Sequence, residues 1–240
     1  FCSFNWYISS TEIAKQFFNF LKTTAKKADA LYILGDFFEI WIGDDDLTPF
    51  NLTVIKALKD YTDSGIPTYI MHGNRDFLIG RRFLKATGCQ LLKDPSLIKL
   101  YDIPVLLMHG DLLCTQDTEY LNVRKKLRNP ARHALFFLFK SLKQRKEYAT
   151  KLRLKSKERY KTIDKTITDA NPAAINAYLI KYKADYLIHG HTHRTNIHHF
   201  KIGEKSALRA VLSSWHETPN MLVCTPSKDG SALAFKLESV

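Results

Sequence analysis

The chain has 240 residues, of which 45% are hydrophobic, and a formal net charge of +12. A chain of this length and composition can bury a large core as one α/β domain, or as one domain carrying a subdomain. There is neither a run of the ~20 apolar residues that a membrane span needs nor a basic stretch followed by an apolar signal segment. The four cysteines lack a CxxC pair, which favours reduced thiols.

The hydrophobic pattern predicts alternating helices and strands. Residues 11–27 have apolar side chains at helical spacing, and 30–34 form a short apolar run typical of a buried strand. The same rhythm predicts a helix at 51–64, a strand at 67–71, a helix at 77–86 and a strand at 103–108. A helix-rich stretch at 118–182 precedes a strand at 184–188, and short strands follow at about 195–201, 207–213, 220–225 and 231–237. The predicted fold class is therefore α/β.

Four of the predicted strands are followed by glycine and by residue types that bind metals. The segments are Gly35-Asp36, His72-Gly73-Asn74-Arg75-Asp76, His109-Gly110-Asp111 and His189-Gly190-His191-Thr192-His193. Carboxylate, amide oxygen and imidazole together suit Mn, Fe or Zn. Because strand ends of an α/β sheet meet in a common crevice, we expect a two-metal site there, with the Asp36 carboxylate suited to bridge the ions. Its predicted ligands are Asp36, Asn74, His109, His189 and His191.

The positive charge is concentrated in one segment. Residues 122–165 contain sixteen Lys or Arg and three acidic residues, with an apolar run at 134–139. Such a segment can contact anionic lipid or an acyl chain through an amphipathic helix. A solvated basic helix packed on the core by its apolar side is the more frequent case, and a nucleic-acid-binding patch is a third interpretation that the pattern leaves open.

The metal-type motifs resemble those of the calcineurin-like metallophosphoesterases, which carry Asp-x-His, Gly-Asp, Gly-Asn-His, a lone His and Gly-His-x-His. Arg75 stands where that pattern usually has a histidine. With Trp41-Ile42-Gly43-Asp44-Asp45-Asp46 and His189 to Arg194, the chain looks like the UDP-2,3-diacylglucosamine hydrolases of lipid A biosynthesis from about Ala14 to Glu217.

The resemblance implies a β-sandwich flanked by helices, forming a single domain at 1–240 with a helix-rich cap insertion at 118–182. It implies hydrolysis of the pyrophosphate of UDP-2,3-diacylglucosamine to UMP and 2,3-diacylglucosamine 1-phosphate, by attack of a metal-activated water on the α-phosphate with two Mn²⁺ ions. A metallophosphoesterase of soluble nucleotides or phosphodiesters is the alternative, and a non-catalytic module that binds nucleic acid or membrane is a third hypothesis.

The resemblance also assigns roles to individual residues. The expected catalytic residues are Asn74, Arg75 and His109. The expected substrate-binding residues are Asn74, Arg75, Asp117, Ser156, Tyr160, Ile163 and His189. Tyr160 and Ile163 stand where the family has Asn and Lys, so Lys161 or Lys165 is a candidate to supply the missing charge. We also expect Asp76 and Asp111 to orient Arg75 and His109.

The first metal motif departs from the family pattern. Ser3 and Asn5 occupy its Asp-x-His positions and are not matching ligands. One metal site would then retain only Asp36 and His191 and bind weakly, whereas the other keeps four ligands. Because the chain starts with Phe1 rather than Met, truncation or misreading of the first residues is the favoured explanation, and loss of one metal is the other.

The expected partners follow from the same resemblance. They are UDP-2,3-diacylglucosamine and the inner-membrane surface of a Gram-negative bacterium, which the basic, Phe-rich segment would contact. No nucleic acid and no obligate protein partner are expected. The expected location is the cytoplasm, peripherally on the cytoplasmic face of the inner membrane.

Overall fold

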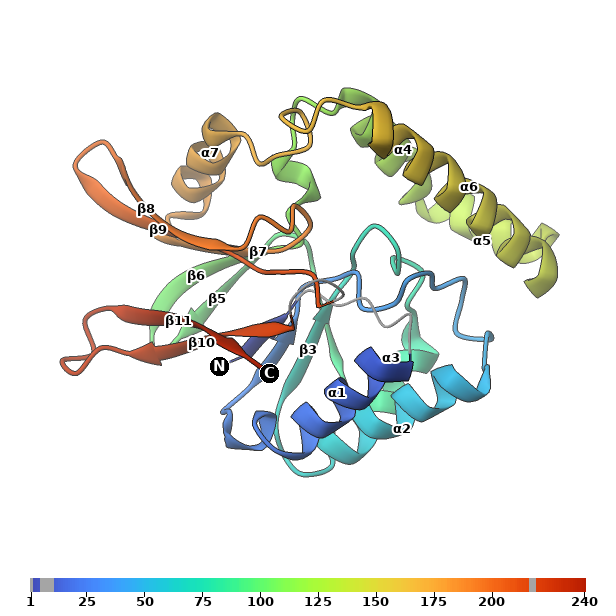
Figure 1. Ribbon diagram of the computed structural model, residues 1–240, viewed down its shortest axis with the longest axis horizontal. Coiled ribbons are helices and arrows are strands. Elements are labelled where there is room, and N and C mark those ends of the chain that lie inside the picture. Colours follow the sequence, from blue (N-terminus) through green and yellow to red (C-terminus); the bar gives the residue numbers. More distant parts are fainter. Residues whose placement is uncertain (1, 5–10, 216–218) are drawn as a thin grey trace.

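Two β-sheets packed face to face form the centre of the molecule (Figure 1). The computed structural model describes residues 2–4, 11–215 and 219–240. The first sheet has the order β11 (Leu233–Ser239), β10 (Asn220–Pro226), β1 (Cys2–Phe4), β2 (Leu31–Ile33), β3 (Thr68–Met71) and β4 (Gln90–Leu92). The second has the order β5 (Ser96–Leu100), β6 (Ile103–Met108), β7 (Tyr186–His189), β9 (Lys205–Val211) and β8 (Asn196–Ile202).

The strand directions bring the metal-type motifs together. Strands β1 to β4 run parallel to one another, and so do β6, β7 and β9. A parallel arrangement places the carboxyl ends of neighbouring strands at the same edge of a sheet. The loops that follow β2, β3, β6 and β7 therefore converge, as the contacts described below show.

Apolar side chains fill three layers of core. Between the sheets, Leu34 and Met71 pack with Leu107, Ile188 and Ala210. The outer face of the first sheet is covered by α1 (Thr11–Lys22), the 3₁₀ turn η1 (Ala25–Lys27), α2 (Pro49–Thr62) and α3 (Arg81–Thr87). Helix α7 (Pro172–Tyr182) covers the second sheet through a cluster that includes its residues Ile175 and Leu179. The result is a four-layer α/β sandwich.

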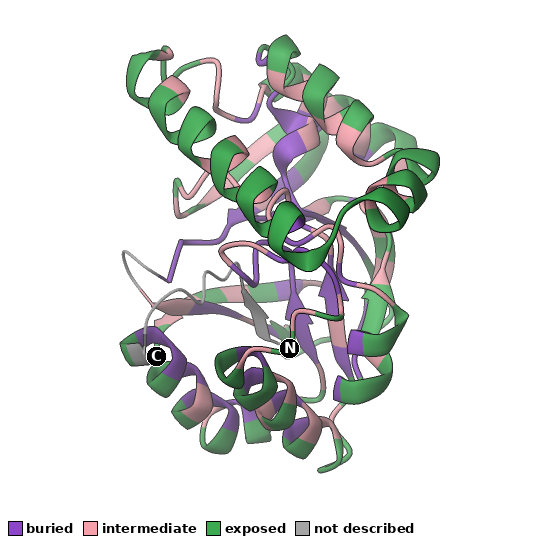
Figure 2. Cartoon of the chain, turned by 90° about the vertical axis from the view of Figure 1, so that its right-hand side faces the viewer, coloured by how far each residue is buried: buried purple, intermediate pink, exposed green. Residues whose placement is uncertain are grey.

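Three helices project from this sandwich and form what we call the helical arm, residues 118–162 (Figure 1). They are α4 (Thr118–Leu127), α5 (Pro130–Phe139) and α6 (Leu142–Thr162), preceded by the short turn η2 (Asp111–Leu113). Each arm helix begins at a side chain that accepts backbone N–H groups: Asp117, Asn129 and Ser141. Most of the arm surface is exposed (Figure 2).

The predicted cap insertion at 118–182 thus contains the arm together with α7, which packs on the second sheet. We retain the division of the chain into one domain and an insertion as a prediction. Within the part of the chain that the structure describes, no helix has the length and apolarity that crossing a membrane requires.

The largest differences from the sequence prediction concern α1, α3 and two missed strands, while the other predicted boundaries move by no more than two residues. Helix α1 ends at Lys22, five residues early, and the chain continues through η1. Helix α3 begins at Arg81 rather than at 77, because the Asp44 carboxylate accepts the backbone N–H groups of Gly80, Arg82 and Phe83. Strands β4 and β5 were not predicted, and β4 is an edge strand with largely exposed side chains, so it lacks an apolar alternation.

Candidate metal centre

Two glycines allow the loops after β2 and β3 to touch. A Cβ atom on Gly73 would lie 2.1 Å from the backbone nitrogen of Asp36, and a Cβ on Gly35 would lie 2.6 Å from the Cα of Gly73. Both distances are shorter than any atomic contact allows, so only glycine fits. Asp36 itself has φ 53°, a left-handed conformation that costs a residue with a side chain about 1–3 kcal/mol. The site therefore stores backbone strain at a predicted ligand.

Side chains from four strand ends meet at this point. The ligand-type atoms of Asp36, His109 and His191 lie within 4.8 Å of one another. The Oδ1 atom of Asn74 lies 3.1 Å from Nε2 of His109 and 3.0 Å from Nδ1 of His191. Four of the five predicted ligands are thus in contact, while His189, at the end of β7, is not part of that group of three among the described residues.

The hydrogen bonds of two histidines leave a nitrogen suited to a metal. His109 is fully buried and its Nδ1 donates to the carbonyl of Leu34 at 2.9 Å, so the Nε2 lone pair faces the cluster. His189 is also fully buried, and its Nδ1 donates to the carbonyl of Gly190 at 2.9 Å. Its Nε2 atom is buried and has no hydrogen-bond partner among the residues that the structure describes. Buried polar atoms nearly always have a partner, so Nε2 of His189 is suited to be a ligand of a metal cation.

The charges agree with a cation site. Burial disfavours ionisation of Asp36, but His109, Arg75 and His191 outweigh it and hold the pKa of this carboxyl below its usual value. Burial lowers the pKa of His189 to about 3 and that of His191 to about 4. At neutral pH both imidazoles are uncharged, which is the form that binds metals.

Buried aspartates hold the ligand loops in place. Asp76 accepts the backbone N–H groups of Phe37 at 2.6 Å and Gly73 at 2.7 Å, and so joins the loops after β2 and β3. Burial and the nearby Asp36 raise the pKa of Asp76 to about 6. The expected partner of Asp76 was Arg75; its carboxylate orients the backbone of the loop that carries this arginine and also acts electrostatically on the guanidinium.

A second carboxylate acts on His109 besides the expected Asp111. Asp94 accepts the backbone N–H of His109 at 3.1 Å and forms an ion pair with Arg124 of α4 at 2.9 Å. Asp111, which interacts electrostatically with His109, accepts the hydroxyl of Tyr120 and the Nε–H of Arg124, each at 2.6 Å. Sequence reasoning missed Asp94, since it lies in a loop without a motif. The base of the helical arm is therefore joined to the metal-type ligands through Arg124.

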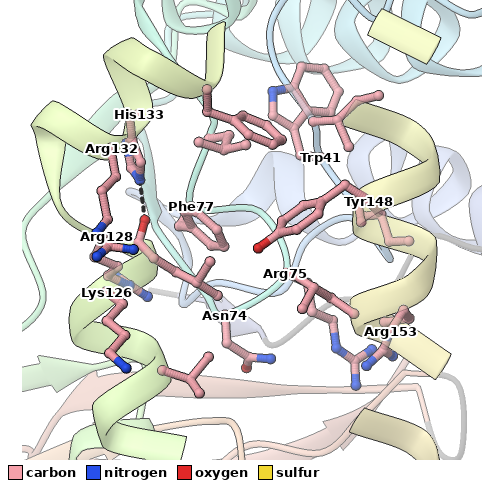
Figure 3. Close-up of a pocket in the computed structure, with 18 of the residues that line it drawn as sticks. Trp41, Asn74, Arg75, Phe77, Lys126, Arg128, Arg132, His133, Tyr148 and Arg153 are labelled. Carbon is pink, nitrogen blue, oxygen red and sulfur yellow. Dashed lines mark hydrogen bonds between the residues drawn. The ribbon is translucent and has the colours of Figure 1, made fainter. Parts of the chain in front are cut away.

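A large apolar cavity begins beside Asn74 and Arg75 and extends under the helical arm (Figure 3). Its volume is about 700 Å³, within the range of small-molecule sites. Apolar groups from both sides of the cavity face one another, and cationic groups lie along its edge. The apolar lining includes Trp41, Phe77, Leu78, Val123, Leu127, Leu135, Phe136, Phe139, Tyr148 and Leu152, and the cations are Arg75, Arg124, Lys126, Arg128, Arg132, Lys140 and Arg153.

The predicted substrate-binding residues occupy different positions around this cavity. Asn74, Arg75 and Ser156 line it. Asp117 is buried and paired with Arg159, whose Nη2 atom lies 2.6 Å from its Oδ1. The three remaining predicted substrate-binding residues differ in exposure. His189 is fully buried, Tyr160 is 56% exposed, and Ile163, which directly follows α6, is half-buried. Their roles in binding stay predictions.

The first-motif positions are only partly described. Backbone pairing places Ser3 opposite Tyr32 of β2 and Leu222 of β10, so β1 is an inner strand of the first sheet. It runs parallel to β2, the strand that leads to Asp36. Asn5 lies outside the described residues. The weakness of the first metal site accordingly remains a prediction.

Comparison with known proteins agrees with this geometry. The family model of the calcineurin-like phosphoesterases matches residues 10–195. A UDP-2,3-diacylglucosamine hydrolase of Pseudomonas fluorescens is 47% identical over 205 residues, covering 85% of this chain and 82% of the relative. The hydrolases of Photobacterium profundum and of an Enterobacter species are 43% and 46% identical, covering 93% and 89% of this chain and 90% and 88% of those relatives.

The chain belongs to the calcineurin-like phosphoesterases and, within them, to the family of the UDP-2,3-diacylglucosamine hydrolases. The predicted fold class and family are thereby confirmed. This family uses divalent metal ions, and the contact between Asp36, His109 and His191 gives the chain a place for one. Among solved structures, Vps29 from Entamoeba histolytica covers 100% of this chain and 98% of its own at a TM-score of 0.45 and 14% identity, too distant a likeness to support an argument.

Proposed function

We propose that this protein hydrolyses the pyrophosphate of UDP-2,3-diacylglucosamine to UMP and 2,3-diacylglucosamine 1-phosphate. The oxygen of water bonds to the α-phosphorus, the bond from that phosphorus to the bridging oxygen breaks, and the bridging oxygen leaves with the sugar phosphate. One observation carries the proposal beyond the family: an apolar cavity of about 700 Å³ is lined at one end by Asn74, a member of the metal-type cluster, and by Arg75. Such a site fits a molecule with a charged phosphate end and a long apolar end.

The residues at the strand ends would hold the metal. Asp36, Asn74, His109 and His189 would supply ligands to one ion, and Asp36 and His191 would supply part of the ligand set of a second. We infer that the ion is Mn²⁺, which the family resemblance implies and which is one of the ions, with Fe and Zn, that the mixed oxygen and nitrogen ligands suit. When bound, such an ion lowers the pKa of water and neutralises charge on a phosphoryl oxygen.

The chain itself contributes binding and orientation. Arg75 lies between the metal-type cluster and the cavity, and its Nε atom is 3.4 Å from Oδ2 of Asp36. We infer that its planar guanidinium binds an α-phosphate oxygen as negative charge develops there. Asn74 and His109 complete the proposed catalytic set, and Ser156 and Asp117 the proposed contacts to the nucleotide-sugar end.

The apolar lining speaks against the alternative of a soluble nucleotide or simple phosphodiester as substrate. Phe77, Leu135, Phe136 and Leu152 would have no partner in such a molecule. Burial of an acyl chain against these residues would, in contrast, stabilise the complex by about 25 cal/mol for each Å² of apolar surface removed from water. A substrate with a lipid end therefore explains the apolar lining of the cavity, which a nucleotide alone would not contact.

We also propose that the tip of the helical arm contacts the cytoplasmic face of the inner membrane, where a diacylated substrate would reside. Leu138 is 74% exposed and Phe139 is 73% exposed at the end of α5, and Lys140 and Lys143 follow them. Apolar groups beside lysines favour a surface of anionic lipid. Flotation with phosphatidylglycerol vesicles tests this: a Leu138→Ser, Phe139→Ser variant should float less than the original chain, and equal flotation would contradict it.

Release of UMP from UDP-2,3-diacylglucosamine tests the main proposal. We expect UMP to appear with Mn²⁺ and to be abolished by EDTA and by His109→Ala. A Ser3→Asp, Asn5→His variant measures the effect of the first motif, and it should be faster than the original chain. Cleavage of a simple phosphodiester without any cleavage of the lipid substrate would refute the assignment while leaving the family intact.

A further inference from the structure

One carboxylate outside the predicted site lies between two guanidinium groups at the cavity. Glu39, in the loop after β2, has Oε2 3.3 Å from Nη1 of Arg75 and accepts the Nε–H of Arg153 through Oε1 at 2.8 Å. Arg75 comes from the loop after β3, and Arg153 from the middle of α6 in the helical arm. All three side chains line the cavity. Glu39 therefore joins the body of the protein to the arm beside the metal-type cluster.

The two arginines lie next to each other on the same side of the cavity, close to Asn74 (Figure 3). Their side chains are only 15% and 17% exposed, so solvent screens their mutual repulsion weakly. Burial lowers the pKa of Arg75, Arg153 lowers it further, and Asp36 and Glu39 oppose both effects. Glu39 contacts both guanidinium groups, whereas Asp36 contacts Arg75 from the opposite side, at Nε.

We propose that Glu39 is a positioning residue for the hydrolysis: it fixes the guanidinium groups of Arg75 and Arg153 side by side, facing the place of the substrate diphosphate. This inference rests on the proposed function for its substrate. The Nη1 of Arg75 donates a hydrogen bond to Oε2 of Glu39 at 3.3 Å, whereas its Nε forms an ion pair, not a hydrogen bond, with Asp36 at 3.4 Å, so Glu39 supplies the directional contact that orients the fork. A fixed fork matters because bidentate contact with a phosphate depends on angle as well as distance.

The amide of glutamine makes a sharp test. In Glu39→Gln the amide oxygen can accept from one guanidinium, but the amide N–H₂ group faces the other guanidinium with like-signed donors. We expect kcat for UMP release to fall by about tenfold to 100-fold, the loss typical of a slightly misplaced reacting group, with KM changed much less. Glu39→Asp keeps the charge and should recover part of kcat.

Two controls separate positioning from folding. Glu119→Gln removes a carboxylate of the helical arm that pairs with Arg159 at 3.0 Å, and it should leave kcat unchanged. In an Arg75→Met background, Glu39→Gln should cause less than about twofold further loss, because coupled residues are non-additive. An additive loss, or a fall in melting temperature without a fall in kcat, would overturn the inference.

A measurement without substrate distinguishes this inference from the proposed function. In ¹⁵N-arginine-labelled protein, the Nε–H signal of Arg153, assigned through Arg153→Lys, should exchange faster with water in Glu39→Ala than in the original chain. Unchanged exchange would overturn the role of Glu39 whatever the substrate. Faster exchange in a chain that releases no UMP would retain the holding role and reject only the proposed reaction.

Discussion

Arg124 offers the clearest test of how the helical arm is attached. Its Nε atom lies 2.6 Å from Oδ2 of Asp111 and its Nη2 atom 2.9 Å from Oδ2 of Asp94. The two carboxylate side chains are 0% and 3% exposed. In Arg124→Met they would remain buried while their shared cation is gone. Removing one partner of a buried ion pair costs about 3–5 kcal/mol.

The local contacts set where in that range the loss should fall. The hydroxyl of Tyr120 still donates to Asp111, and Arg128 lies 3.9 Å from it, so we expect about 3 kcal/mol. For a domain of this size that corresponds to roughly 6–12 °C in melting temperature. Because both carboxylates can then take up protons, the penalty should shrink as the pH falls from neutral towards ~4.

Urea unfolding of the Arg124→Met and Arg194→Met variants measures this loss. Arg194 pairs with Asp169 at 2.6 Å, but the two side chains are 48% and 33% exposed, so its loss should cost less than about 1 kcal/mol. If the two variants are destabilised equally, or if Arg124→Met loses the same free energy at low and neutral pH, the reasoning about buried carboxylates is wrong.

Three further predictions concern the ligand loops, the histidines and the arm. Gly73→Ala places a Cβ 2.1 Å from the backbone nitrogen of Asp36, so it should lower the free energy of unfolding by about 1–3 kcal/mol and weaken the binding of Mn²⁺ in calorimetry. Gly65→Ala places a Cβ that meets no atom within 4 Å and should keep full affinity for Mn²⁺. The folded-state pKa values of about 3 for His189 and about 4 for His191 lie below the unfolded value of ~6.5, so the unfolded chain binds more protons between these pH values. The free energy of unfolding of the metal-free protein, measured in urea, should therefore decrease as the pH falls from ~6.5 towards ~4. His189→Gln should make this pH dependence shallower, and an unchanged pH dependence would contradict the reasoning. Arg145 is buried and bound to Asp45 and to the carbonyl of Ile42, so Arg145→Met should speed proteolysis of the arm, while Lys151→Met, on the exposed side of α6, should not; equal rates would contradict the attachment.

The short-range pattern predicted which polar side chains meet at the strand ends. Asp36, Asn74, His109 and His191 each follow a strand closely, and the direction of parallel strands brings such positions together without further information. The flanking glycines could be found for the same reason, since a Gly beside a ligand at a strand end indicates close approach of two loops. Strand β6 has the predicted bounds because its apolar run is buried between helix and sheet.

Residues whose partners lie far away in the sequence could not be found from local patterns. Asp94, Glu39 and Arg153 are charged residues in loops or on a basic helix, where a single charge is usually solvated and carries no periodic signal. The start of α3 likewise depends on Asp44, a residue 36 positions before Gly80. Only the folded chain shows which of the many charges are buried and which partner each one contacts.

The sequence by itself determined the α/β class, the ligand types at the strand ends and the concentration of positive charge in the segment at 122–165, because each of these is a local property of composition or spacing. The tertiary structure alone decided that the helical arm encloses an apolar cavity beside Arg75, and that Glu39 and Arg124 connect the arm to the ligand loops. The physical reason is that burial and ion pairing depend on distances between segments far apart in the chain, which local patterns do not encode.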